Sequence, residues 1–383
     1  MCYIFKMSVN NLKKIPVFDF KVGDLEKKYI QDCLDKSFIG QGFYVKELEK
    51  KFSKYVNCKH GITTTSGTTA LHLACATLGL NNDDEVLVSS STNMACAFSV
   101  DYCGSIPIPI DIEKETWQMD VNLIEKNITP RTKAIMVVHL FGHPVDMDPV
   151  IEIAKKHKLF IIEDCAEAHG VEYKGKKVGS IGDIGTFSFF ANKTITCGEG
   201  GMVVTNSDEL AEKARSLKNL SYGKVDKFMH EDIGFNYRLP NISAAMGLGQ
   251  FENIEKIIKE KERIYSRYIK NLKGVKGVNI PIVKNWATKY IMWVFNLYLD
   301  SKYPLSRDEL VKKLSESNID TRNAFVPINK QDVLIKKYNK FKAESCPNAN
   351  YIMDNGFYLP SGNTITNEEI DIVSNKIIEF SKK

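Results

Sequence analysis

Short apolar runs alternate with helix-like segments through the first two thirds of the chain. The runs that predict strands are residues 85–90, 106–112, 134–140, 160–165, 186–190 and 202–206. Residues 69–79 (TALHLACATLG) predict a helix among them. Continuous apolar strands that are separated by helices are typical of a parallel sheet buried on both faces. This part of the chain is therefore expected to be an α/β domain with a mostly parallel central sheet.

The pattern changes after Pro240, where apolar residues recur at the spacing of a helix. The spacing predicts one long helix from about 241 to 272. Residues 290–300 (YIMWVFNLYLD) predict a strand, and Ser306 with Glu309 forms a capping-box signature that opens another helix. A last helix closes the chain. These elements predict a smaller α+β domain after the sheet domain.

The length of 383 residues agrees with two domains at roughly 100–200 residues each. We expect the first, 1–248, to hold the sheet and an N-terminal segment, and the second, 249–383, to hold the long connecting helix and the smaller domain. The net charge of +5 comes from lysines scattered along the chain. A nucleic-acid-binding protein would carry a dense basic stripe, so no nucleic-acid partner is expected.

The cysteines and the apolar content bear on the cellular compartment. There are nine cysteines and no Cys-x-x-Cys pair, which argues against zinc ribbons and redox pairs and is typical of a reducing cytoplasm. The first residues contain too short an apolar stretch for a signal peptide. No run of 18 apolar residues exists, so no membrane span is expected. The sequence predicts a cytoplasmic protein.

Several motifs suggest chemistry that their context does not support. Residues 170–177 nearly match a phosphate-binding loop, but the last position is Lys and no helix follows, so a surface hairpin is expected. His139 and His143 lie at a strand end and in a turn, which favours structural roles over metal binding. Glu163 and Asp164 are adjacent on a strand and point to opposite faces, so they cannot act together as a glycosidase pair. No metal is expected.

Three features favour a functional role. Ser66, Gly67 and Thr68 open a helix with small residues whose N–H groups suit an anion, although an ordinary helix cap has the same pattern. Asp164 lies near the carboxyl end of a strand, where α/β sheets bind ligands; the alternative is a structural cap. Lys193 follows a buried strand, where a desolvated lysine can form a Schiff base; the alternative is a side chain that reaches solvent.

Taken together, the three features describe one chemistry. A phosphate would sit on the helix N-terminus, an aspartate would pair with a protonated ring nitrogen, and a lysine would condense with an aldehyde. Pyridoxal 5′-phosphate requires this set of groups. The sequence therefore predicts an enzyme that uses this cofactor.

The sequence also resembles a known family from about Val22 to its C-terminus. The stretches that carry the resemblance include TTSGTTALHLA (64–74), EDCAEAHG (163–170), GSIGDIGTFSFFANKTITCGEGGMVVTN (179–206) and GFNYRLPNISAAMGLGQ (234–250). They are similar to the DegT/StrS family of sugar aminotransferases, which have the fold-type-I aminotransferase architecture. The resemblance implies a homodimer with shared active sites.

The resemblance also implies roles for individual residues. Lys193 matches the Schiff-base lysine, and Asp164 matches the carboxylate that pairs with the pyridine nitrogen. Glu167 falls where a Gln or Glu contacts the phenolic oxygen of the cofactor. The residues that match phosphate-binding positions are Gly67, Thr68, Ser188 and, from the neighbouring subunit, Asn236.

The reaction implied is transfer of the amino group of L-glutamate to C4 of a nucleotide-linked 4-keto-6-deoxy sugar, with GDP-4-keto-6-deoxymannose favoured. The alternatives are a UDP- or dTDP-linked sugar, amination at C3, or a non-catalytic regulatory paralogue. Two positions depart from the family pattern. Asn93 stands where an aromatic residue usually stacks on the cofactor, and Asn329 replaces the His of a Phe-x-Pro-x-His motif.

Overall fold

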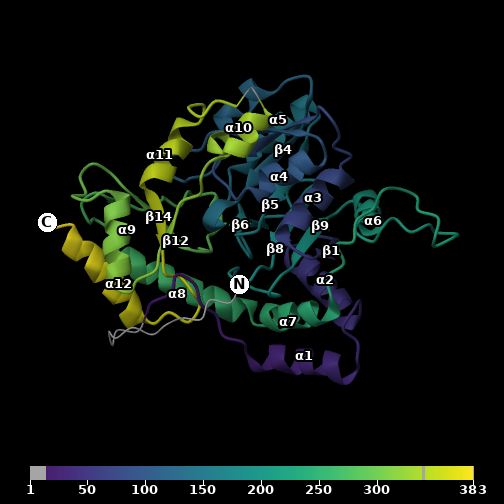
Figure 1. Ribbon diagram of the computed structural model, residues 1–383, viewed down its shortest axis with the longest axis horizontal. Helices are drawn as coiled ribbons and strands as arrows, with labels where there is room; N and C mark the ends of the chain where they lie inside the picture. The colour runs from purple at the N-terminus through teal and green to yellow at the C-terminus, as the bar shows by residue number, and fades with distance from the viewer. Residues whose placement is uncertain (1–13, 339–340, 383) are drawn as a thin grey trace.

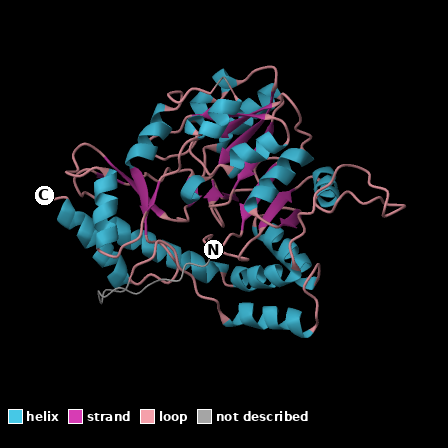
Figure 2. Cartoon of the chain, viewed as in Figure 1, coloured by secondary structure: helices cyan, strands magenta, loops and turns pink. Residues whose placement is uncertain are grey.

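The computed structural model describes residues 14–338 and 341–382. Figure 1 shows a larger α/β part around a central sheet and a smaller part that holds the C-terminus, with the helices α7 (Asn241–Glu252) and α8 (Ile254–Leu272) running beneath them. Figure 2 shows how the strands of each part are surrounded by helices. No helix in the described ranges is long and apolar enough to cross a membrane.

The central sheet contains seven strands. They are β1 (His60–Thr64), β2 (Glu85–Ser89), β3 (Ile106–Ile110), β4 (Thr132–Val138), β5 (Phe160–Asp164), β8 (Ile184–Ser188) and β9 (Gly201–Thr205). Their order in the sheet is β1-β9-β8-β5-β4-β2-β3. All neighbouring pairs from β8 to β3 are parallel, and β9 runs antiparallel to both β1 and β8. The predicted mostly parallel sheet is confirmed. Strand β1 was not predicted, because Ile62 is its single large apolar residue and one such residue makes no strand pattern.

Helices cover both faces of this sheet. One face carries α2 (Phe43–Tyr55), α5 (Met147–His157) and α7 (Asn241–Glu252); the other carries α3 (Gly67–Thr77), α4 (Ala95–Tyr102) and α6 (Asp208–Leu217). Successive residues of one strand reach opposite cores, as Val86 and Leu87 of β2 do. This double burial explains why the strands are continuously apolar. The helix α1 (Asp24–Asp35) lies against α7 (Figure 1).

The predicted long helix is wrong in one respect, because the chain forms two helices there. Helix α7 ends at Glu252, and α8 (Ile254–Leu272) begins after Asn253. The Asn253 side chain donates to the Gly249 carbonyl at 3.1 Å, and its own carbonyl accepts from the Lys256 and Ile257 N–H groups of α8. An asparagine that competes for backbone hydrogen bonds interrupts a helix in this way. The domain boundary between 248 and 249 stays a prediction.

The smaller part is built on a four-stranded antiparallel sheet. Its strands, in sheet order, are β10 (Val278–Asn279), β12 (Phe295–Leu299), β14 (Gly356–Leu359) and β13 (Arg322–Asn323). Helices α8, α9 (Arg307–Glu316) and α12 (Asn367–Phe380) share a core with this sheet. The predicted capping box is present at the start of α9. Only residues 295–299 of the predicted strand 290–300 pair in this sheet. Residues 290–294 lie toward the central sheet instead, where the Trp293 N–H donates to the Phe141 carbonyl.

The remaining elements are short. A small sheet combines β11 (Ala287–Lys289) with the hairpin of β6 (Glu172–Tyr173) and β7 (Lys176–Lys177). Lys174 and Gly175 have φ values of 46° and 80°, as a tight hairpin turn requires, so the hairpin prediction for 170–177 is confirmed. Helices α10 (Asp332–Lys337) and α11 (Pro347–Asn355) and the 3-10 helices η1 (Val121–Leu123), η2 (Glu125–Asn127), η3 (Leu140–Gly142) and η4 (Ile328–Lys330) complete the described chain.

Candidate active site

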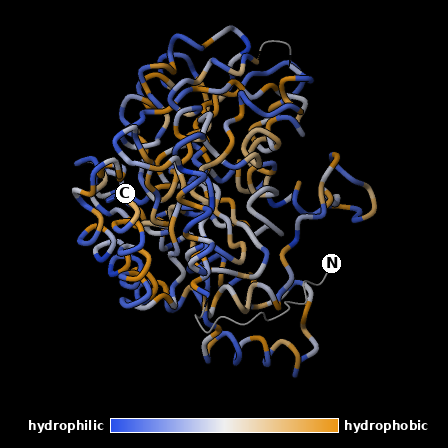
Figure 3. The backbone as a smooth tube through the Cα atoms, turned by 60° about the vertical axis from the view of Figure 1, so that its left-hand side comes forward, coloured by the Kyte–Doolittle hydropathy of each residue, from blue (hydrophilic) through white to orange (hydrophobic). Residues whose placement is uncertain are grey.

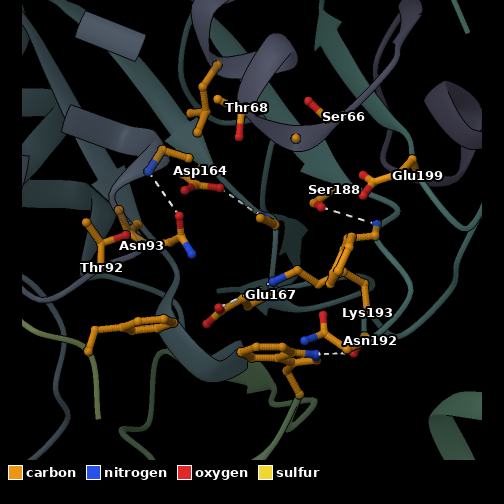
Figure 4. Close-up of a pocket in the computed structure, with 18 of the residues that line it drawn as sticks. Ser66, Thr68, Thr92, Asn93, Asp164, Glu167, Ser188, Asn192, Lys193 and Glu199 are labelled. Atoms are coloured by element: carbon orange, nitrogen blue, oxygen red, sulfur yellow. Dashed lines mark hydrogen bonds and ion pairs between the residues drawn. The ribbon is translucent and has the colours of Figure 1, made fainter. Parts of the chain in front are cut away.

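A cavity of about 430 Å³ opens at the carboxyl ends of the parallel strands. Val138, Asp164 and Ser188, the last residues of β4, β5 and β8, line it. Parallel α/β sheets place ligands at this edge. The smaller part closes the other side with Trp293, Phe325 and Tyr358. Figure 4 shows polar side chains from separate elements converging on the space between them.

The N-terminus of α3 forms one end of the cavity. The hydroxyl of Ser66 accepts a hydrogen bond from the Thr69 N–H at 3.1 Å. The N–H groups of Gly67 and Thr68 have no helical partners, because no turn of helix precedes them. A Cβ atom at position 67 would lie 2.7 Å from the Cβ of Ser188. Glycine therefore lets the Ser188 hydroxyl stand beside the helix N-terminus. This arrangement suits an anionic group.

Asp164 presents a buried carboxylate to the middle of the cavity. The residue is 5% exposed. Its Oδ1 accepts from the Ala166 N–H at 2.9 Å, and its Oδ2 accepts from the Cys96 thiol at 3.0 Å. Burial and the neighbouring Asp164 raise the pKa of Cys96 well above its ordinary value, so the thiol remains a donor. These two donors orient the carboxylate, and a cationic ligand group in the cavity would complete its coordination.

Lys193 lies in the loop after β8 and reaches the cavity from the opposite side to Asp164 (Figure 4). Its Nζ is 3.4 Å from Oε1 of Glu167 and 3.9 Å from the centre of the Trp293 ring. The indole N–H of Trp293 donates to the Asn192 carbonyl at 2.7 Å, which fixes the ring beside the lysine. A carboxylate and an aromatic face therefore both contact the Lys193 side chain.

Glu167 is buried and has a second hydrogen bond. Its Oε2 accepts from the Phe141 N–H at 3.0 Å. Burial raises the pKa of Glu167, and the charge of Lys193 and the Phe141 N–H act in the opposite direction. A carboxyl group with a raised pKa beside an amine is typical of sites that move protons.

Six of the seven predicted site residues line this one cavity: Gly67, Thr68, Asp164, Glu167, Ser188 and Lys193. The seventh, Asn236, does not line the cavity of its own chain. It is exposed on a segment whose backbone pairs with Asn219. Its placement fits a residue that acts in a neighbouring subunit, and that role stays a prediction.

The two positions that depart from the family pattern differ in their surroundings. Asn93 lines the cavity, and its Oδ1 accepts from the Ala95 N–H at 3.0 Å. Asn329 is fully buried and does not line the cavity; its Nδ2 donates to the Ala343 carbonyl at 2.7 Å. In that motif, Phe325 is the residue that faces the cavity, where it stacks on Phe141 at 5.8 Å.

Glu163 serves the structure behind the site. Its carboxylate accepts from three N–H groups of the loop 179–182 and from Nε2 of His139 at 3.0 Å. Nδ1 of His139 accepts from the Val145 N–H at 3.1 Å, so neither ring nitrogen has a lone pair left for a metal. Cys165 lies close enough to complete a three-ligand group, but this bonding gives all three residues structural partners.

Sequence analysis missed several residues of the cavity wall. They are Thr92, Glu199, Trp293, Tyr358 and, behind Asp164, Cys96. Trp293 and Tyr358 lie in or beside apolar strand segments, where an aromatic residue predicts core packing. Cys96 lies within a helix and looked like a small apolar residue. Local pattern gave no signal for these residues, because only the fold brings them to the cavity.

The comparisons with known proteins define the class. The model of the DegT/DnrJ/EryC1/StrS aminotransferase family matches residues 21–378. The chain belongs to this family, which confirms the resemblance seen in the sequence. The enzyme class and the aminotransferase fold follow from this membership and from the solved relative below.

Individual relatives agree over nearly the whole chain. The GDP-perosamine synthase of Escherichia coli O157:H7 is 40% identical over 370 residues, which are 96% of this chain and 99% of that protein. The GDP-perosamine synthase of Caulobacter vibrioides is 38% identical over 367 residues, 95% and 98% of the two chains. The crystal structure of S. venezuelae DesV, in complex with a ketimine intermediate, superimposes with a TM-score of 0.89 at 31% identity over 97% of this chain and 100% of that one.

Proposed function

We propose that this protein transfers the amino group of L-glutamate to C4 of GDP-4-keto-6-deoxymannose, with pyridoxal 5′-phosphate as cofactor, and so produces GDP-perosamine. The observation that carries the proposal is the convergence of Lys193, Asp164 and the N-terminus of α3 on one cavity. The similarity to two GDP-perosamine synthases over nearly the full chain supports the choice of sugar.

The residues present fit this cofactor. The free N–H groups of Gly67 and Thr68 and the hydroxyl of Ser188 would hold the phosphate, because a side chain at position 67 would fill that space. Asp164 would pair with the protonated ring nitrogen, because its buried carboxylate forms no ion pair with any residue that the structure describes. When bound, the cofactor supplies an electron sink for the carbon from which a proton leaves.

Lys193 has two tasks in this proposal. Its amine would hold the cofactor covalently. When that amine is free, it would accept the proton that leaves the α-carbon of glutamate and would become an ammonium group. Glu167, at 3.4 Å, would stabilise this ammonium form. Glu167 would also contact the phenolic oxygen of the cofactor, as the family resemblance implies.

Asp164 would keep the ring nitrogen of the bound cofactor protonated through its negative charge. Two opposite charges about 4 Å apart interact by ~4 kcal/mol at an effective dielectric constant of 20. That energy corresponds to about a thousandfold in rate if it is fully expressed at the transition state. The hydrogen bonds from Cys96 and Ala166 hold the carboxylate in the orientation that this interaction needs.

A second cavity of about 250 Å³ supports a large substrate. It shares Asn192, Trp293 and Tyr358 with the first cavity. Arg322 lines it, and within the described ranges the only hydrogen bond of this guanidinium goes to the adjacent Thr321 carbonyl at 2.9 Å. A guanidinium with free donors suits phosphate. We assign the sugar to the first cavity and the diphosphate to the second.

The proposal includes a homodimer with shared sites. Asn236 would reach the phosphate of the neighbouring subunit. It follows a projecting segment, residues 222–233, that leaves the body of the molecule after α6 (Figures 1 and 3). Val225, Phe228 and Ile233 of this segment are at least 80% exposed. Apolar side chains gathered in this way are typical of a surface that a second chain covers.

The protein's own spectrum and a substrate panel test the proposal. Purified protein incubated with pyridoxal 5′-phosphate should turn yellow, lose that colour with L-glutamate, and regain it with GDP-4-keto-6-deoxymannose. A preference for a UDP- or dTDP-linked sugar, or a product aminated at C3, would change only the proposed substrate and would leave the proposed aminotransferase reaction in place. Failure of glutamate to change the spectrum would favour a non-catalytic regulatory protein. We place the reaction in the cytoplasm, since the cysteines of the described ranges are free.

A further inference from the structure

The amino group of a lysine lies buried beneath the active site. Lys261, on α8, is 1% exposed, and its Nζ donates to the carbonyls of Trp293 at 3.0 Å and Ser361 at 2.7 Å. No carboxylate of the described ranges forms an ion pair with it. An apolar residue would fill the same space without the cost of burying a charge. The presence of a lysine at this position therefore has to be explained by the two segments whose carbonyls it binds.

The first carbonyl belongs to the residue that faces Lys193. The Trp293 ring lies 3.9 Å from Nζ of Lys193, and its indole N–H donates to the Asn192 carbonyl at 2.7 Å. Its backbone N–H donates to the Phe141 carbonyl at 3.3 Å. Lys261 supplies the remaining hydrogen bond, to the carbonyl group, and so fixes the backbone from which the ring projects.

The second carbonyl belongs to the turn after β14. The Ser361 N–H donates to the Val17 carbonyl at 3.0 Å, and its hydroxyl accepts from the Phe295 N–H at 2.9 Å. Val17 lines the second cavity. The amino group of Lys261 therefore links a wall of the first cavity, the start of β12 and a wall of the second cavity.

We infer that Lys261 is a positioning residue that holds the Trp293 ring over Lys193 and joins the two cavity walls through the Trp293 and Ser361 carbonyls. Burial lowers the pKa of Lys261 to about 7, in agreement with a desolvated amine whose partners are carbonyls alone. Lys261 touches neither cavity. It acts through Trp293, so a substitution of Lys261 should displace the indole ring while the fold is retained.

The first test observes the indole without cofactor or substrate. The chain has three tryptophans, so protein labelled with 5-fluorotryptophan should give three ¹⁹F resonances, and Trp293→Phe identifies the one from Trp293. Lys261→Met keeps the apolar stem and removes the donors; it should shift or broaden the Trp293 resonance alone. Lys259→Met is the matched control on the exposed face of α8 and should leave all three unchanged. An unshifted Trp293 resonance in Lys261→Met would overturn the inference.

The second test rests on the proposed function. Lys261→Met should slow the glutamate half-reaction about tenfold, the order of one lost hydrogen bond to a charged group. The same substitution in a Trp293→Phe background should cost much less, because the residue through which it acts is already changed. Equal losses in both backgrounds would show a general structural role and would contradict the inference. If the Met variant does not fold, Lys261→Gln, whose shorter side chain cannot bridge both carbonyls, serves for both tests with the same expected results. A parent protein without activity would refute the proposed function, and the ¹⁹F result would still decide the role of Lys261.

Discussion

The Nζ of Lys193 lies 3.4 Å from Oε1 of Glu167, although the two residues come from the separate loops that follow β8 and β5. Burial raises the pKa of Glu167, and the ammonium of Lys193 opposes that rise. The pair thus holds an amine and a carboxyl group that can exchange a proton inside a cavity closed by aromatic residues. Replacement of Lys193 should therefore remove both the amine and its effect on Glu167.

Lys193→Met should abolish turnover and prevent covalent attachment of the cofactor, because no other amine lines the described cavity. Borohydride reduction followed by peptide mass spectrometry should find the pyridoxyl adduct on the peptide with Lys193 in the parent and on no peptide in the variant. Loss of the ammonium should also raise the pKa of Glu167 further. Lys174→Met, at an exposed position, is the control. An adduct on another lysine of the parent protein would refute the assignment.

Asp164→Asn should slow the glutamate half-reaction by about a thousandfold, since the neutral amide cannot hold the ring nitrogen protonated. Cofactor binding should persist through the groups near α3. Stopped-flow absorbance measures the rate, and equilibrium dialysis measures retention. Asp148→Asn, an exposed carboxylate paired with Lys174, should behave as the parent. A parental rate in Asp164→Asn would show that the carboxylate does not act on the ring.

Residue pattern predicted the parts of this protein that depend on local spacing. The strands buried on both faces are continuously apolar, and the capping box of α9 contains its own signal in Ser306 and Glu309. The adjacent Glu163 and Asp164 were expected on opposite faces, as β5 places them. The motif around Lys193 predicted the cofactor chemistry that we propose.

The rest depends on contacts between distant segments. Trp293 stands over Lys193 because α8, β12 and the turn at Ser361 meet beneath it, and no window of sequence contains that meeting. The interruption at Asn253 depends on one side chain that bonds to its own helix, which apolar periodicity does not register. Buried polar residues such as Lys261 look like surface residues until the fold encloses them.

Arg322→Met should raise the KM for the nucleotide sugar by roughly 10- to 100-fold, the effect of losing hydrogen bonds to a charged group. The rate of the glutamate half-reaction should stay near the parental value if Arg322 binds the diphosphate. A raised KM for glutamate alone would instead assign a substrate carboxylate to the second cavity. Steady-state kinetics with each substrate varied separately distinguishes these results, and Arg131→Met, an exposed arginine paired with Glu85, is the control.

If the protein is the proposed homodimer, Val225→Asp together with Phe228→Asp should convert it to a monomer, because both side chains project from the body on segment 222–233 and would place charge in the proposed interface. Sedimentation velocity measures the change, and cofactor retention should fall with it if Asn236 completes the neighbouring phosphate site. Ile372→Asp places the same charge at a half-exposed position on α12 and should leave the assembly intact. An active monomer would refute the shared site.

Lys261 should make the free energy of unfolding depend on pH. The substitution Lys261→Met should remove this dependence. Burial lowers its pKa from 10.5 to about 7 in the folded state. Between these two values the unfolded chain binds one proton more than the folded chain, so this residue makes folding more favourable as pH rises. The penalty is fully present below about pH 7 and disappears as pH approaches 10.5.

The free energy of unfolding of the parent, measured relative to Lys261→Met by urea denaturation, should therefore rise by ~1.4 kcal/mol per pH unit between pH 7 and 9. Lys259→Met, compared with the parent in the same way, should show no such slope, because its side chain is exposed. The subtraction cancels groups that titrate alike in both proteins. A difference that does not change with pH would mean that the folded protein keeps Lys261 charged throughout this range, and the carbonyls of Trp293 and Ser361 would then stabilise the ammonium more strongly than burial destabilises it.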